Sequence, residues 1–151
     1  MKATFGAGCF WHVEESFREV KGVTKTTVGF MGGTVKDPTY EEVCSGKTGH
    51  IEVCQVEYDP KTISYEELLD IFWSIHDPTQ VGGQGVDMGY QYLSVIFYHD
   101  EEQKNIAKES LKKKQKKLSD KISTMIEPAK EFFKAEEHHQ KYLKKKGLHT
   151  C

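Results

Sequence analysis

The sequence predicts an α/β (α+β) protein, a helix-over-sheet sandwich with a mixed sheet and a ferredoxin-like plait core. Segments with strand periodicity and segments with helix periodicity alternate along all 151 residues, which favours helices layered on a sheet. Several expected strands are joined by long crossovers and few by hairpins, so some neighbouring strands should run parallel. We expect one domain over residues 1–151, in which residues 147–151 form a flexible C-terminal tail.

The first half of the chain predicts a strand, a helix and two further strands. The helix follows the glycine turn Gly6-Ala7-Gly8 and is closed by Gly22, a typical helix stop. The last of these strands alternates strictly, which places Glu52 and Cys54 on one face. The expected elements are strands at residues 1–5, 23–30 and 50–58, a helix at 10–20 and a loop at 31–38.

The second half predicts three helices and two strands. Ser64 with Glu67 forms a capping box, and Asp100 with Gln103 gives a similar start to the next helix. Pro128 can open the last one. The expected elements are helices at residues 64–75, 100–118 and 128–143, strands at 92–98 and 122–126, and a loop at 76–91. A loop of this length is usually functional.

The charges nearly cancel, with 21 Lys and Arg against 23 Asp and Glu and a formal net charge of -2. A basic field for nucleic acid is therefore absent. The lysine-rich residues 112–117 and 144–146 are interpreted as solvated helix faces, because acidic residues share these helices. No apolar run approaches the roughly 18 residues of a membrane helix, and no signal peptide is recognised. We expect a cytoplasmic protein, by default a monomer, with no membrane or nucleic-acid partner.

Cys9 is the most informative of the cysteines, which form no CxxC pair. It directly follows the glycine turn and starts the expected helix, where unpaired amide groups and the helix dipole stabilise a thiolate. The neighbouring Phe10 and Trp11 can line a pocket for an apolar group. The alternative is that Cys9 is a buried structural cysteine and that both aromatic residues belong to the core.

The segment Gly8-Cys9-Phe10-Trp11, followed by Val13-Glu14 and Phe17, resembles the active-site motif of the type A peptide methionine sulfoxide reductases, that is, peptide-methionine (S)-S-oxide reductases. Further blocks similar to that family follow in the same order over nearly the whole chain. They are Gly29-Phe30-Met31-Gly32-Gly33, Pro38-Thr39-Tyr40, Glu42-Val43-Cys44-Ser45-Gly46, Thr48-Gly49-His50-Ile51-Glu52, Tyr58-Asp59-Pro60, His76-Asp77-Pro78-Thr79-Gln80, Gln84-Gly85, Asp87, Gly89, Gln91-Tyr92 and Ala135-Glu136. One short motif is weak support, whereas many ordered blocks leave little room for chance.

The resemblance implies a thiol-dependent oxidoreductase that reduces methionine S-sulfoxide, free or in proteins, and so repairs proteins under oxidative stress. It implies that Cys9 attacks the sulfoxide sulfur and becomes a sulfenic acid. It also implies that Phe10 and Trp11 hold the methyl group of the substrate.

Four further residues gain a role through the resemblance. Glu52, kept protonated by burial, is expected to give a proton to the leaving oxygen, with Tyr40 and Tyr92 as hydrogen-bond donors. Asp87 is expected to orient this group. Without the resemblance, we would interpret Glu52 as a surface carboxylate and the two tyrosines as half-buried residues at the edge of the core.

The resemblance also implies a second thiol that condenses with the Cys9 sulfenic acid to a disulfide. We expect this resolving thiol to be Cys151, on the C-terminal tail, with Cys54 as the alternative because it shares a strand face with Glu52. Cys44 is expected to be structural. Thioredoxin is the expected electron donor, and neither a bound cofactor nor a metal ion is expected, so the histidines are interpreted as structural.

Four positions depart from the family pattern, and none carries an expected chemical role. They are His12 in place of glycine, Phe30 in place of tyrosine, Val86 in place of asparagine and Leu93 in place of arginine. Val86 and Leu93 flank Asp87 and Tyr92, so they bear on the geometry of this loop and on the preference for peptide substrates.

Two other classes of function remain open at this point. A sensor of peroxide could use Cys9 without a sulfoxide substrate, although the aromatic pair beside the thiol speaks against it. A non-catalytic module could bind RNA through its basic C-terminal half, although the near-neutral net charge speaks against that.

Overall fold

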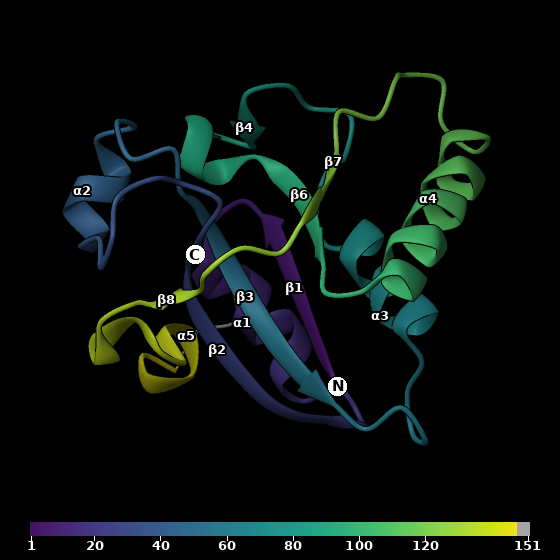
Figure 1. Ribbon diagram of the computed structural model, residues 1–151, viewed down its shortest axis with the longest axis horizontal. Coiled ribbons are helices and arrows are strands. Elements are labelled where there is room, and N and C mark those ends of the chain that lie inside the picture. Colours follow the sequence, from purple (N-terminus) through teal and green to yellow (C-terminus); the bar gives the residue numbers. More distant parts are fainter. Residues whose placement is uncertain (148–151) are drawn as a thin grey trace.

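The centre of the computed structural model, which describes residues 1–147, is a six-stranded sheet in the order β7-β6-β1-β3-β2-β8 (Figure 1). The strands are β1 (Lys2–Ala7), β2 (Val23–Met31), β3 (Ile51–Tyr58), β6 (Ser94–Tyr98), β7 (Met125–Pro128) and β8 (Phe133–Lys134). Strands β6 and β7 are parallel and the other neighbouring pairs are antiparallel, so the sheet is mixed. The order β6-β1-β3-β2, with a helical crossover after β1 and another after β3, is the predicted ferredoxin-like plait.

Local sequence signals explain where the helices begin. At the start of α3 the Glu67 N–H donates to Ser64 Oγ at 3.1 Å and the Ser64 N–H donates to Glu67 Oε1 at 3.2 Å, which completes the predicted capping box. At the start of α4 the Gln103 N–H donates to Asp100 Oδ1 at 2.8 Å. The helices are α1 (Phe10–Arg18), α2 (Tyr40–Cys44), α3 (Tyr65–Ser74), α4 (Glu101–Gln115) and α5 (Tyr142–Lys145), with 3-10 turns at Tyr90–Tyr92 and Glu137–His139.

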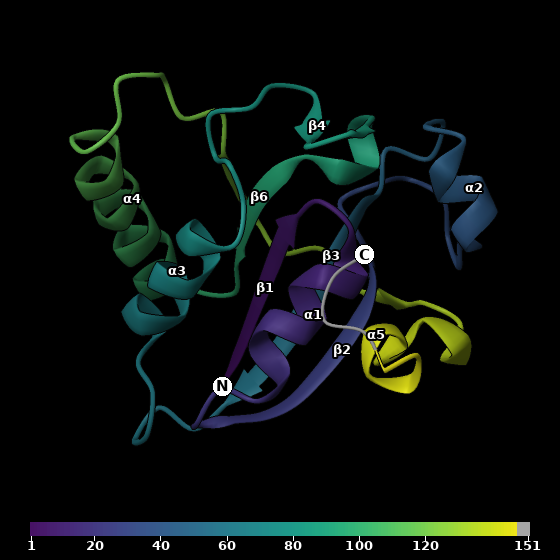
Figure 2. The same ribbon diagram turned by 180° about the vertical axis from the view of Figure 1, so that it is seen from behind.

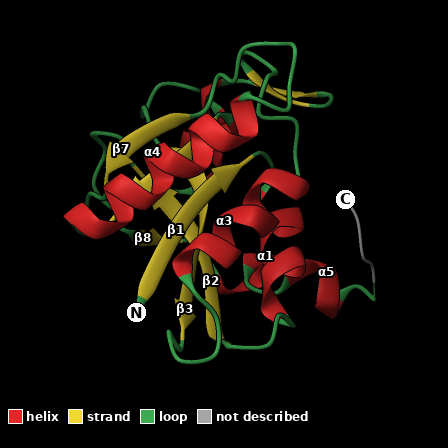
Figure 3. Cartoon of the chain, turned by 90° about the vertical axis from the view of Figure 1, so that its right-hand side faces the viewer, coloured by secondary structure: helices red, strands yellow, loops and turns green. Residues whose placement is uncertain are grey.

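The two faces of the sheet are covered differently. Helices α1, α3 and α4 pack on one face (Figures 2 and 3), where Phe5 and Phe17 stack with ring centroids 5.3 Å apart in the larger apolar cluster. On the other face the chain between β7 and β8 crosses the sheet (Figure 1), and its Phe132 packs on a smaller cluster. Cys54 lies in the larger cluster and Glu52 contacts α1, so these residues share the helix-covered face as predicted.

The last predicted helix, over residues 128–143, is wrong. This segment instead contains the short strand β8, a 3-10 turn and the single turn α5. The segment is held to β2 instead: the Ala135 N–H donates to the Val28 carbonyl at 3.1 Å. The Gln140 side chain accepts from the Val28 N–H at Oε1 and donates to the Val28 carbonyl at Nε2, both at 2.8 Å. A Cβ on Gly29 would lie 2.3 Å from the Phe133 carbonyl oxygen, so β8 can approach the sheet edge only beside a glycine.

Three smaller differences from the predicted elements occur. The edge strand expected at residues 122–126 is found as β7, shifted towards the C-terminus. Helix α2 was not predicted, although Thr39 and Glu42 form a capping box at its start, with the Glu42 N–H 3.1 Å from Thr39 Oγ1. The predicted loop at 76–91 contains a small hairpin of β4 (Gly83–Gln84) and β5 (Asp87–Met88). Within residues 1–147 no helix is long and apolar enough to span a membrane.

Candidate active site

Cys9 lies where a strand turns into a helix. Strand β1 ends two residues earlier, Gly8 has a φ of 94°, and Cys9 immediately precedes α1. A Cβ on Gly8 would lie 2.9 Å from the Cβ of Gln84, so the turn requires glycine both for its backbone angle and for this close approach. The Cys9 carbonyl accepts the N–H of His12 at 3.2 Å, and the half-buried side chain lies at the positive end of the helix dipole.

The carboxyl group of Glu52 lies beside the start of the same helix. Its Oε1 accepts a hydrogen bond from the Phe10 N–H at 3.3 Å, and the residue is 1% exposed. Burial raises the pKa of Glu52 to about 8, opposed by the Phe10 N–H and assisted by the charge of Asp87. The carboxyl group therefore holds a proton at neutral pH. Its Oε2 has no hydrogen-bond partner among the described residues, so this polar atom is available to a ligand.

Two tyrosines and an aspartate from separate segments share the electrostatic environment of Glu52. Tyr40 starts α2, Asp87 starts β5 and Tyr92 ends the 3-10 turn before β6. Burial, together with the charge of Glu52, raises the pKa of Tyr92 to about 12 and raises the pKa of Tyr40 still further. Both phenols therefore keep their protons and remain hydrogen-bond donors across the physiological pH range.

An aromatic wall adjoins the start of α1. The ring centroid of Tyr40 lies 6.0 Å from that of Phe10 and 6.3 Å from that of Trp11. Tyr142 stacks on Trp11 at 3.9 Å, and His139 stacks on Tyr40 at 4.4 Å. Trp11, Tyr40, His139 and Tyr142 line a surface pocket of about 510 Å³. Such a pocket suits a small apolar group that carries a polar end.

His139 fixes the orientation of the Trp11 indole. The Trp11 Nε1–H donates to His139 Nδ1 at 3.1 Å, and His139 Nε2 lies 3.2 Å from Glu136 Oε2. Burial lowers the pKa of His139, so the ring is neutral, and a neutral ring that accepts at Nδ1 carries its proton at Nε2. Glu136, His138 and His139 hold possible metal-ligand atoms within 4.8 Å of one another, but the proton at Nε2 opposes metal coordination by this ring.

The remaining predicted thiols lie in different surroundings. Cys54 is fully buried on β3, and burial raises the pKa of its thiol well above the ordinary value. Cys44 is exposed at the end of α2. Cys151, the predicted resolving thiol, and residues 148–151 of the predicted tail lie outside the described residues.

Two histidines that the sequence left without a chemical role hold backbone and side chains in place. His50 Nδ1 accepts from the Gly33 N–H at 3.0 Å, so Nε2 donates to the Val35 carbonyl at 2.6 Å. The ring of His76 lies between the Phe72 carbonyl and Ser94 Oγ, each at 2.7 Å. These contacts agree with the structural interpretation of both residues.

Residues 1–151 match the family described as "Peptide methionine sulfoxide reductase". The chain belongs to this family. It is 55% identical over 152 residues to "Peptide methionine sulfoxide reductase MsrA" of Methanothermobacter thermautotrophicus, a match that covers 99% of this chain and 90% of that protein. The structure is similar to that of reduced Mxr1 from Saccharomyces cerevisiae, with a TM-score of 0.93 and 39% identity over 97% of this chain and 86% of that one. Mxr1 in complex with Trx2 is similar at a TM-score of 0.67 and 28% identity, covering 94% and 84%.

Sequence reasoning missed two residues that the structure places against Trp11, His139 and Tyr142. The only signal nearby was the Ala135-Glu136 block, which resembles the family but precedes both residues. Their contact with Trp11 joins segments more than a hundred residues apart, and no local periodicity reports such a contact.

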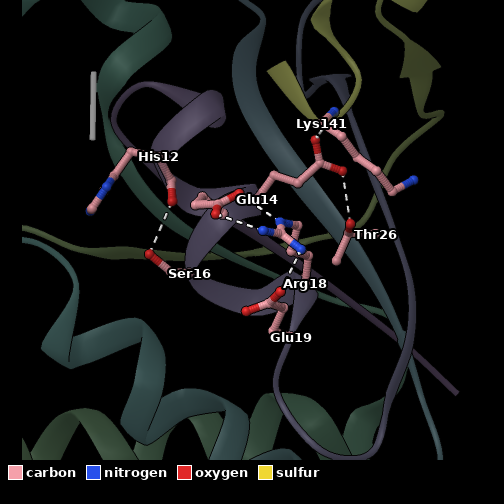
Figure 4. Close-up of polar contacts among 8 residues, drawn as sticks. His12, Glu14, Ser16, Arg18, Glu19, Thr26 and Lys141 are labelled. Carbon is pink, nitrogen blue, oxygen red and sulfur yellow. Dashed lines mark hydrogen bonds and ion pairs between the residues drawn. The ribbon is translucent and has the colours of Figure 1, made fainter. Parts of the chain in front are cut away.

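A buried carboxylate ties the segment that carries His139 and Tyr142 to α1 (Figure 4). Glu14 is 1% exposed; its Oε1 accepts the Lys141 N–H at 2.5 Å and its Oε2 accepts the Thr26 hydroxyl at 2.8 Å. Lys141 has a φ of 52°, which non-glycine residues rarely adopt, so the hydrogen bond helps to hold the chain in this turn. Glu14 thereby positions the residues on both sides of Lys141 against Trp11.

We expect Glu14→Ala to lower the free energy of unfolding by about 2 kcal/mol, because it leaves the buried Thr26 hydroxyl and the Lys141 N–H without their acceptor. Urea unfolding at neutral pH measures this change. Glu19→Ala, at the exposed residue that ends the same helix, is the matched control and should change the stability by less than about 0.5 kcal/mol. Equal stability of the two variants would contradict the anchoring role of Glu14.

Proposed function

We propose that this protein reduces methionine S-sulfoxide, free or in proteins, to methionine, with Cys9 as the nucleophile. The observation that carries the proposal is the pairing of a thiol at a helix start with a buried, protonated carboxyl group: the residue after Cys9 donates its backbone N–H to Glu52. Membership of the peptide methionine sulfoxide reductase family supports the same reaction.

In the first step the Cys9 thiolate attacks the sulfoxide sulfur while the Glu52 carboxyl group gives its proton to the sulfoxide oxygen. The sulfur–oxygen bond of the substrate and the sulfur–sulfur bond formed in the attack both break, the oxygen passes to Cys9 as a sulfenic acid, and methionine is released. Tyr40 and Tyr92 donate hydrogen bonds to the oxygen as charge develops on it. Asp87 acts through Glu52, because its charge helps to keep the carboxyl group protonated.

The substrate methyl group lies against the Trp11 indole, whereas Phe10, which is 0% exposed, packs in the core beside this wall. The indole is held by His139 and stacked on Tyr142, so the wall is fixed before the substrate binds. Burial of one methyl group on such a wall is worth about 1 kcal/mol, which is enough to select a side chain that ends in a methyl thioether.

In the second step a further thiol attacks the Cys9 sulfenic acid, which forms a disulfide and releases water. We assign this role to Cys151. The alternative, Cys54, is fully buried in the core and its thiol pKa is raised, so both access and thiolate formation oppose it.

In the last step a dithiol reductant exchanges with the disulfide and restores both thiols. We propose thioredoxin, because the related Mxr1 has been solved in complex with Trx2. The cycle draws its two electrons from this external thiol, so it needs no bound cofactor, and it suits the reducing cytoplasm.

The test is a single-turnover reaction of the reduced protein with the two separated epimers of a methionine sulfoxide peptide, with thiols counted before and after. We expect consumption of the S epimer alone and the loss of two thiols per protein. Cys151→Ser should still consume one equivalent but accumulate a sulfenic acid, whereas Cys54→Ser, the matched control, should still lose two thiols. Consumption of neither epimer would overturn the proposed function, and loss of two thiols in Cys151→Ser would overturn the assigned resolving thiol.

A further inference from the structure

Apolar exposure in this protein is concentrated in one short segment. Among the large apolar residues of the described chain that are exposed, all except Met1 lie between positions 81 and 90, around the β4–β5 hairpin. We call the side chains of Val81, Val86, Met88 and Tyr90 the hairpin patch; they are between 48% and 96% exposed. Single exposed apolar residues need no explanation, but a cluster of them usually marks a contact surface.

The hairpin that carries the patch is well braced. The side-chain amide of Gln80 spans its turn: Oε1 accepts from the Gly85 N–H at 2.8 Å and Nε2 donates to the Gly85 carbonyl at 3.1 Å. Gln84 is held in the same way by the backbone of Asp77, at 2.9 and 2.6 Å. The patch is therefore presented on a fixed backbone, and a partner that binds it need not order a loose loop.

The hairpin adjoins the Cys9 site. Gln84 lies so close to Gly8 that it leaves no room for a side chain there. Asp87, on the returning strand, raises the pKa of Glu52 through its charge. Val86 lies between these two residues at the turn and is 96% exposed. A polypeptide whose sulfoxide reaches Cys9 therefore has the turn of the hairpin, with Val86, beside its path, whereas Tyr90 lines a separate pocket with Gly32, Ile51 and Phe97.

The chemistry of the patch points to one kind of occupant. Methionine in folded proteins is mostly surrounded by other apolar residues, and its oxidation makes the side chain polar and disrupts that packing. An oxidised methionine made accessible by local unfolding is therefore flanked by apolar side chains. Val86, which is 96% exposed at the turn of the hairpin, offers such a segment an apolar surface.

We propose that the hairpin patch binds the apolar side chains that flank methionine sulfoxide in an unfolded polypeptide, so that this protein selects apolar-flanked sulfoxides. This inference rests on the proposed function and specifies its substrate class. The thioether of Met88 is held by the Gln80 amide at 3.2 Å, and it offers the partner a polarizable, adaptable contact.

The test compares three substrates: N-acetyl-methionine S-sulfoxide, a peptide with leucine on both sides of the S-sulfoxide, and the same peptide with serine in those positions. We expect kcat/KM of the unaltered protein to be about tenfold higher for the leucine peptide than for the serine peptide. The double variant Val86→Asn, Met88→Gln should lose this ratio while its kcat/KM for N-acetyl-methionine S-sulfoxide stays unchanged. Lys61→Asn, a change at an exposed residue in the turn after β3 at the opposite end of the sheet, should keep the ratio.

Equal kcat/KM for the two peptides in the unaltered protein would overturn the inference. So would a double variant that keeps the peptide ratio but shows a raised KM for thioredoxin, because the patch would then bind the reductant. Absence of turnover with N-acetyl-methionine S-sulfoxide in the unaltered protein would overturn the proposed function itself, and this inference with it.

Discussion

Cys9→Ser abolishes sulfoxide reduction, with a loss of about 10⁴-fold or more, because a serine hydroxyl at this position cannot accept the oxygen atom as a thiolate does. The fold should persist, since the side chain at the start of α1 is only half-buried and the Cys9 carbonyl, which accepts the N–H of His12, is unchanged. Turnover of a methionine S-sulfoxide peptide with thioredoxin measures the loss, and the urea midpoint measures the fold.

Cys44→Ser is the matched control for this variant. It makes the same chemical change at an exposed cysteine at the end of α2, where a serine hydroxyl can keep the hydrogen bond to Tyr40, so it should keep its activity. Turnover by Cys9→Ser at a rate close to that of the unaltered protein would show that another group is the nucleophile.

Glu52→Gln should lower the rate of the first step by about 100-fold or more, because an amide cannot supply the proton that a general acid supplies. In the unaltered protein this rate should fall as the pH rises through about 8, where the Glu52 carboxyl group loses its proton. The variant should show no such fall. Single-turnover methionine release between pH 6 and 9.5 measures both effects.

The same proton affects stability, which gives a second measurement. The folded protein holds it up to about pH 8, whereas an unfolded chain releases it near pH 4.5, so this group makes the free energy of unfolding fall as the pH rises between these values. Glu52→Gln should remove that fall, and Glu57→Gln, on the same strand, should leave it in place. An identical pH dependence of urea unfolding in both variants would contradict the buried, protonated state of Glu52.

Most of the fold was predictable because its signals are local. The capping boxes at Ser64 and Asp100 and the alternation around Glu52 depend on residues within a few positions of each other. The segment after Pro128 was not, because its backbone pairs with β2 and the Gln140 side chain bonds the backbone of Val28, 112 positions away. A helical pattern in the sequence does not reveal that such a competitor exists.

The candidate site also contains residues that the sequence could predict and residues that only the fold reveals. Cys9 and its aromatic neighbours are contiguous, and the glycine turn before them gave a physical reason to single out the thiol. Glu52 gained its expected role from the family blocks, and the structure adds the cause of its protonation, which is burial beside Phe10. His139 was set aside as structural, because only the fold reveals that its Nδ1 meets the Trp11 indole.

The return of residues 135–145 to the first helix has a consequence for the protein during its synthesis. Trp11 is translated among the first residues, yet the histidine that orients it and the backbone N–H that Glu14 holds come about 130 codons later. A nascent chain with the plait already formed therefore still has an incomplete pocket. It can reduce a sulfoxide only when this late segment has been made and has packed against α1. Ribosome-bound chains that end before residue 135 should thus be partly folded and should lack sulfoxide reductase activity.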